Sequence, residues 1–163
     1  PMGYEWFQLY LNGTHISNAS AKEYDVAKRK ISENVKKIHN SIILLLENLD
    51  LEMTDCFVMG FSQGGMMAFE LGQILQNQLA GLAIISSRII SKEHRPNNAF
   101  LKTPIFISHG GQDAVLPISN YNESIEVLKN YNYNYENYLI EKDEHTMSQE
   151  TITLFQNFIK KNI

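Results

Sequence analysis

The hexapeptide G-F-S-Q-G-G at residues 60–65 holds the side chain best suited to covalent chemistry in this sequence, Ser62. It matches G-x-S-x-G, in which a sharp turn from a strand into a helix lifts a serine hydroxyl above the carboxyl edge of a sheet. Glycines are expected there because side chains would collide with neighbouring backbone. The alternative is a glycine-rich turn with an incidental serine. An apolar run at residues 56–59 and a helical pattern after the motif favour a nucleophile.

A nucleophilic serine needs a general base, and the base needs an acid that orients it. On folds that use this motif, the partners follow in the order serine, acid, histidine. Asp113 comes after the apolar residues 105–107, and His145 comes after the apolar residues 138–140. Since the carboxyl ends of parallel strands meet at one edge of a sheet, Ser62, Asp113 and His145 are predicted to converge there as nucleophile, orienting acid and base.

Other histidines and acids compete for these two roles. His109 ends a strand just before Asp113, and we expect it to hold a loop through hydrogen bonds. The remaining histidines lie in polar segments without a suitably spaced acid, and surface positions are expected for them: His15, His39 and His94. Three acids lie too close to His145 in sequence to reach the far side of its ring, and solvated positions are expected for them: Glu141, Asp143 and Glu144.

Metal and cofactor patterns are absent from the sequence. There is no H-x-x-x-H, no C-x-x-C and no carboxylate cluster with the spacing of metal ligands. The glycines at 60, 64 and 65 belong to neither a phosphate-binding loop nor a dinucleotide fingerprint. The sequence therefore predicts chemistry without a metal or a cofactor.

The elements that position these side chains alternate between helical and strand patterns. Ser20 and Glu23 form a capping box, which predicts a helix start. An apolar stripe predicts that this helix covers a sheet face: Val26, Ile31, Val35, Ile38, Ile42, Leu45 and Leu49. Strands are predicted at 56–59, buried on both faces, and at 79–85, 105–107 and 138–140; helices are predicted at 63–76, 118–129 and 147–160.

This alternation predicts an α/β fold, a mainly parallel sheet with helices on both faces, in one domain over residues 1–163. Residues 1–18 are expected to form a short extended piece and a loop. The net charge of −4, with 18 acidic and 14 basic residues, excludes the basic surface that nucleic acids select.

The sequence also bears on where the protein resides. Its apolar runs are far shorter than the roughly 18 residues of a membrane span, so no stable membrane insertion is expected. No signal-peptide pattern opens the sequence, and the lone Cys56 is expected to be an inert buried thiol. We expect a soluble, cytoplasmic protein.

Four stretches together resemble one known family, the phospholipase/carboxylesterase group of α/β-hydrolases that includes the acyl-protein thioesterases. They are E-W-F at 5–7, the motif at 60–65, H-G-G-Q-D at 109–113 with V-L-P at 115–117, and E-H-T at 144–146. The resemblance runs over nearly the whole chain and implies an α/β-hydrolase fold with the same roles for Ser62, Asp113 and His145. The backbone N–H of Gln63 would be one oxyanion donor, because it follows the nucleophile directly.

The resemblance also implies a departure from the family. Its members carry an earlier H-G-x-G loop, which donates the second oxyanion N–H, and the first strands of the sheet. We expect this chain to hold the fold in N-terminally truncated form. The strand at 56–59 would then have an unpaired edge, which favours pairing with a second copy in a homodimer.

A serine hydrolase that cleaves carboxylic esters or thioesters through an acyl-enzyme is the leading functional prediction. Its partner would be a small-molecule or acylated substrate. Met66, Val115 and Leu116 could line an acyl pocket, although each could equally belong to the core. The alternative is a catalytically silent hydrolase fragment that acts as a dimeric or interaction module. A peptidase is disfavoured, because nothing in the sequence marks a side-chain specificity pocket.

Overall fold

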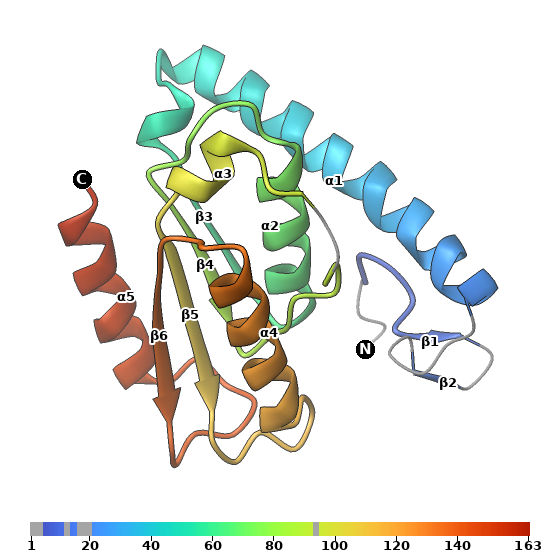
Figure 1. Cartoon of the computed structure of the whole chain (residues 1–163). Coiled ribbons are helices and arrows are strands. Elements are labelled where there is room, and N and C mark those ends of the chain that lie inside the picture. Colours follow the sequence, from blue (N-terminus) through green and yellow to red (C-terminus); the bar gives the residue numbers. More distant parts are fainter. Residues whose placement is uncertain (1–4, 12–13, 16–20, 93–94) are drawn as a thin grey trace.

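Four parallel strands form the centre of the protein. The structure, a computed structural model, describes residues 5–11, 14–15, 21–92 and 95–163 (Figure 1). The sheet has the order β3-β4-β5-β6. Its strands are β3 (Phe57–Phe61), β4 (Gly81–Ile85), β5 (Ile105–Gly110) and β6 (Tyr135–Ile140). Because all neighbours pair in parallel, the four carboxyl ends lie at one edge, where the chemistry-bearing loops begin.

Helices cover both faces of this sheet. They are α2 (Gln63–Ile74), α3 (Asn98–Lys102), α4 (Ile118–Asn130) and α5 (Gln149–Lys161). On one face, Phe158 of α5 packs against Ala83, Ile85 and Phe106. Alternate strand residues, such as Leu82 and Ile84, point into the larger core on the face of α2 and α4 (Figure 1). The predicted α/β class, with a parallel sheet between two helical layers, is confirmed; α3 was not predicted.

Helix α1 (Ala21–Leu49) begins where the capping box predicts, although Ser20 itself lies outside the described residues. It packs along α2, so its contact with the sheet layer is largely through that helix (Figure 1). Ile31 and Val35 of the predicted stripe are buried.

Three stripe positions are more than half exposed, which corrects the prediction: Val26, Leu45 and Leu49. The reason for Val26 and Leu45 is the phase of the helix, because the residue directly after each of them faces the core instead. Ala27 and Leu46 are buried in their place.

Strand β3 lies at an edge of the described sheet, because it pairs with β4 on one side only. The predicted unpaired edge is therefore present. The prediction of a strand buried on both faces is wrong: Met59 is 45% and Phe61 37% exposed. The Cys56 thiol is half-buried, and burial raises its pKa. Because no described strand pairs with its outer side, β3 leaves side chains exposed that a central strand would bury.

The described part of the N-terminal segment contains a small antiparallel pair, β1 (Tyr10–Leu11) with β2 (Thr14–His15). Phe7 anchors this segment in the main core, where it is 2% exposed. None of the described helices is both long and apolar enough to span a membrane.

Candidate active site

Ser62 occupies the turn between the end of β3 and the start of α2. Its backbone has φ 52° and ψ −122°, a left-handed conformation that costs a non-glycine residue energy. The turn is fastened to the next strand, because the Ser62 N–H donates to the carbonyl oxygen of Ile85 at 2.9 Å. The Ser62 side chain does not cap α2. Its hydroxyl is thus raised above the carboxyl edge and is free to meet another group.

The glycines of the motif have different roles. A Cβ on Gly60 would lie 2.1 Å from the carbonyl oxygen of Gly64, and a Cβ on Gly65 would lie 2.6 Å from Cβ of Ser87. A Cβ on Gly64 would meet no described atom within 4 Å. The expected steric requirement therefore holds at Gly60 and Gly65, and the structure does not show it at Gly64.

The structure brings the three predicted side chains into one line. His145 Nδ1 lies 2.7 Å from Asp113 Oδ2, and His145 Nε2 lies 2.9 Å from Ser62 Oγ. A carboxylate accepts, so Nδ1 carries the proton, and Nε2 is left to accept from the serine hydroxyl. This is the geometry that a nucleophile, a base and an orienting acid require.

The Asp113 carboxylate is buried and held on both oxygens. Its Oδ1 accepts from the N–H groups of Leu116 at 2.8 Å and Val115 at 2.9 Å. Burial would raise the pKa of Asp113, but the hydrogen bonds from Leu116, His145 and Val115 outweigh it and hold that pKa below its ordinary value. An ionised carboxylate at neutral pH is what an imidazolium needs beside it.

The competing histidine and acids are not part of the hydrogen-bonded chain from Ser62 through His145 to Asp113. His109 is buried at the end of β5 and bonds the carbonyl oxygen of Leu116 at 2.8 Å, as expected for a loop-holding histidine. The acids near His145 contribute mainly backbone to the site. A Cβ on Gly110 would lie 2.3 Å from the carbonyl oxygen of Glu144, so the His145 loop can rest directly on β5 only because residue 110 is glycine.

Two serines at the end of β4 support the site and were not predicted. Ser86 Oγ donates to the carbonyl oxygen of Thr146 at 2.9 Å and so holds the loop of His145. Ser87 Oγ donates to the carbonyl oxygen of Ser62 and so holds the turn. Their signal in the sequence is a pair of hydroxyls placed directly after a strand, at the edge where the other loops meet.

Gln63 presents both a backbone N–H and a side-chain amide beside Ser62. Its N–H lies in the first turn of α2, where backbone donors have no partner within the helix, so it is available to an oxyanion. Its side chain accepts from the N–H of Trp6 at 2.8 Å and donates to the carbonyl oxygen of Phe7 at 2.6 Å. The N-terminal segment is thereby fastened beside the nucleophile, a contact that the sequence did not predict.

Of the three residues proposed for an acyl pocket, two belong to the core. Met66 is 1% and Leu116 5% exposed, whereas Val115 is 65% exposed. Val115 is the one of the three that a substrate can reach. Phe61 also faces the site, with its ring 5.0 Å from that of His145.

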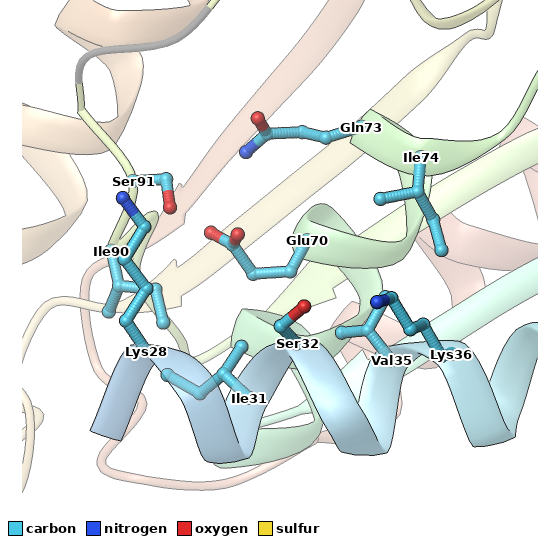
Figure 2. A pocket seen from close by; sticks show the side chains of 10 residues that line it. All are labelled: Lys28, Ile31, Ser32, Val35, Lys36, Glu70, Gln73, Ile74, Ile90 and Ser91. Atoms are coloured by element: carbon cyan, nitrogen blue, oxygen red, sulfur yellow. The ribbon is translucent and has the colours of Figure 1, made fainter. Parts of the chain in front are cut away.

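A separate hollow of about 170 Å³ lies between α1 and α2 (Figure 2). Its lining residues are Lys28, Ile31, Ser32, Val35, Lys36, Glu70, Gln73, Ile74, Ile90 and Ser91. Burial raises the pKa of Glu70, against hydrogen bonds from Ser91 and the charge of Lys28. No cluster of three or more potential metal ligands exists among the described residues.

A sequence profile of the phospholipase/carboxylesterase family matches residues 1–163. The chain belongs to this family. Acyl-protein thioesterase 1 of Debaryomyces hansenii is 27% identical over 158 residues, which cover 94% of this chain and 65% of that protein. Acyl-protein thioesterase 1 of Gibberella zeae is 29% identical over 135 residues, which cover 78% of this chain and 55% of that protein. The chain thus spans less than two thirds of these family members' length.

Solved structures agree on the fold. The esterase PE8 superposes with a TM-score of 0.80 at 22% identity, covering 99% of this chain and 71% of that one. The Bacillus cereus carboxylesterase superposes with a TM-score of 0.78 at 15% identity, covering 98% and 69%. The family member described here therefore has the fold of the α/β-hydrolases, as the sequence predicted.

Proposed function

We propose that this protein hydrolyses carboxylic ester or thioester bonds through an acyl-enzyme. The observation that supports the proposal is the unbroken line of hydrogen bonds from Ser62 Oγ through His145 to Asp113. The strained turn at Ser62 and the buried, ionised Asp113 agree with it. Ser62 is the proposed nucleophile, His145 the general base and Asp113 the orienting acid.

In the first half-reaction, Ser62 Oγ attacks the carbonyl carbon while His145 Nε2 takes the hydroxyl proton. The Asp113 carboxylate, 2.7 Å from Nδ1, stabilises the imidazolium that forms. The tetrahedral intermediate then collapses. The leaving alcohol or thiol takes the proton from His145, and the acyl group stays on Ser62.

In the second half-reaction, water attacks the acyl-enzyme. His145 takes a proton from the water and returns it to Ser62 Oγ as the carboxylic acid leaves. The Gln63 N–H, next to the nucleophile, is the proposed donor to the oxyanion in both steps. A second donor, which the family carries on an H-G-x-G loop, is expected to be worth on the order of a hundredfold in turnover.

The family and two exposed apolar side chains beside the triad support the proposed substrate class. The two relatives are named as acyl-protein thioesterases, and this supports a thioester or oxygen ester of a carboxylic acid as substrate. Val115 and Phe61 are the exposed apolar side chains beside the triad that such an acyl group would meet.

The open edge of β3 supports a second proposal, a homodimer formed through that edge. Its outer side is unpaired among the described strands, and Met59 is 45% exposed there. An apolar hollow of about 150 Å³ borders the same strand between Trp6, Val58 and Gly64. Unpaired backbone groups beside an apolar surface favour pairing with another strand.

The proposed activity is tested by hydrolysis of p-nitrophenyl acetate and butyrate and of a matching acyl thioester. We expect turnover that Ser62→Ala abolishes, and a mass increase of one acyl group on the wild-type protein under a rapid quench. Circular dichroism of both proteins establishes that each is folded. Folded wild-type protein with no more turnover than Ser62→Ala would contradict the proposal.

A further inference from the structure

His109 is a buried polar side chain beside the triad that the proposed mechanism does not use. Its side chain is fully buried at the end of β5. Its ring stacks on Tyr121, with 5.6 Å between centroids and 28° between planes. Nε2 lies 2.8 Å from the carbonyl oxygen of Leu116. A carbonyl only accepts, so Nε2 carries a proton.

The backbone of Leu116 is consequently held on both sides of its Cα atom, at the peptide group that precedes it and at the one that follows it. Its carbonyl accepts from His109 Nε2–H at 2.8 Å, while its N–H donates to Asp113 Oδ1 at 2.8 Å. His109 therefore holds in place the residue whose N–H orients the Asp113 carboxylate. The same Nε2 lies 3.6 Å from Asp113 Oδ2, the oxygen that His145 bonds.

The two ring nitrogens of His109 are not equivalent. Nδ1 is buried and has no hydrogen-bond partner in the described part of the chain. Of the two nitrogens, Nε2 is the one that forms a hydrogen bond with the loop that carries Asp113. Glutamine carries an amide nitrogen near the position of Nε2, whereas the shorter asparagine reaches only to the position of Nδ1. Substitution by each amide therefore tests which of the two ring nitrogens is required.

We propose that His109 is a positioning residue for the reaction. Through the backbone of Leu116, it holds the Asp113 carboxylate in the orientation that His145 requires. This inference rests on the proposed function, since it assigns a role within the same triad.

The test compares His109→Gln, His109→Asn and His109→Leu with the wild-type protein. The probe is a fluorophosphonate, which labels Ser62 at a rate that depends on its activation by His145. We expect labelling and kcat of Asn and Leu variants to fall about tenfold to a hundredfold, as for loss of a hydrogen bond next to a charge, with KM unchanged. His109→Gln should restore the wild-type rate.

A merely structural role would lower the melting temperature without slowing the labelling of folded protein. Equal labelling rates in all variants, or a Gln variant as slow as the Asn variant, would overturn the inference. If the Leu variant fails to fold, the Gln and Asn pair decides alone.

A second measurement separates this inference from the proposed function. The hydrogen-bonded proton on His145 Nδ1 gives a far-downfield NMR resonance, which should shift in His109→Asn and stay in His109→Gln. If wild-type protein is not labelled, the proposed function fails, and this resonance still decides the role of His109. An unchanged resonance in all variants would overturn the inference.

Discussion

Gly65 and Ser87 touch so closely that a Cβ on the glycine would lie 2.6 Å from Cβ of the serine. Helix α2 therefore approaches the end of β4 only because residue 65 has no side chain. Ser87 in turn donates to the carbonyl oxygen of Ser62. The turn that raises the nucleophile is thus coupled to the packing of a residue outside the G-x-S-x-G pattern.

The first prediction concerns this contact. Gly65→Ala should lower the free energy of unfolding by about 1–3 kcal/mol, as overpacking does, and should displace Ser62. The control is Gly64→Ala, because a Cβ there would meet no described atom within 4 Å. Urea unfolding and ester hydrolysis measure both effects. Equal losses for the two variants would show that the contact with Ser87 is not the cause.

The second prediction concerns Asp113. Asp113→Asn keeps an oxygen for the N–H groups of Val115 and Leu116 but presents an N–H₂ group to His145. The imidazole then adopts the wrong tautomer, and kcat should fall by about 10³–10⁴-fold with little loss of stability. Steady-state hydrolysis of p-nitrophenyl butyrate measures the effect. A variant that keeps most of its turnover would show that another acid orients His145.

The third prediction is a pH dependence of stability at Glu70. Burial raises the pKa of this carboxyl in the folded protein, so its ionisation costs stability as pH rises from the unfolded value through the folded one. Glu70→Gln should therefore stabilise the protein at neutral pH, and the gain should disappear in acid. Urea unfolding at several pH values between about pH 4 and about pH 8, where buried carboxyl groups with raised pKa values titrate, measures the difference in stability between the variant and the wild-type protein.

Glu123 is the control for that measurement, because its pKa shifts the other way. The Lys92 ammonium, 2.7 Å away, holds the pKa of Glu123 below its ordinary value. The ionised Glu123 carboxylate stabilises the folded protein at neutral pH, and this stabilisation is lost in acid. Glu123→Gln should therefore be slightly less stable than the wild-type protein at neutral pH. Since the pair is about half exposed, the loss should stay below about 1 kcal/mol. Parallel pH curves for both variants would contradict the prediction.

The fourth prediction concerns the side chain of Gln63. Gln63→Ala removes the bonds to Trp6 and Phe7 but keeps the backbone N–H that is proposed to serve the oxyanion. We expect a loss of about 1–2 kcal/mol in the free energy of unfolding and greater exposure of Trp6. Trp6 is the single tryptophan of the sequence, so its fluorescence reports this segment directly. If the variant had the same emission maximum as the wild-type protein and was quenched by iodide to the same extent, the contact would be contradicted.

The fifth prediction concerns the edge of β3. If two copies pair there, Met59→Lys should produce monomers, because each copy would bring an unpaired charge into the interface. Leu139→Lys is the matched control: Leu139 is 42% exposed on β6, the opposite edge of the sheet. Sedimentation at several concentrations gives the mass. A wild-type monomer, or dimers of both variants, would count against pairing through β3.

Much of the fold and the site was predictable from short stretches of sequence. Strand and helix patterns alternate along the chain, and parallel strands place their carboxyl ends together. Ser62, Asp113 and His145 each follow a predicted strand, so local patterns sufficed to bring them to one edge. The limits of these patterns show in α1, where a continuous apolar stripe leaves Val26, Leu45 and Leu49 exposed. The spacing of apolar residues alone does not say which of two neighbouring apolar residues faces the supporting layer.

The sequence by itself determined which residue types reach the carboxyl edge, because that depends only on the order of strands, helices and turns. Tertiary structure decided which of them touch. The bond from His109 to Leu116, the clamp of Gln63 on Trp6 and the need for glycine at 65 all join segments from separate elements. Such contacts depend on distances between packed elements to within a fraction of an ångström, and no local pattern in the sequence carries that information.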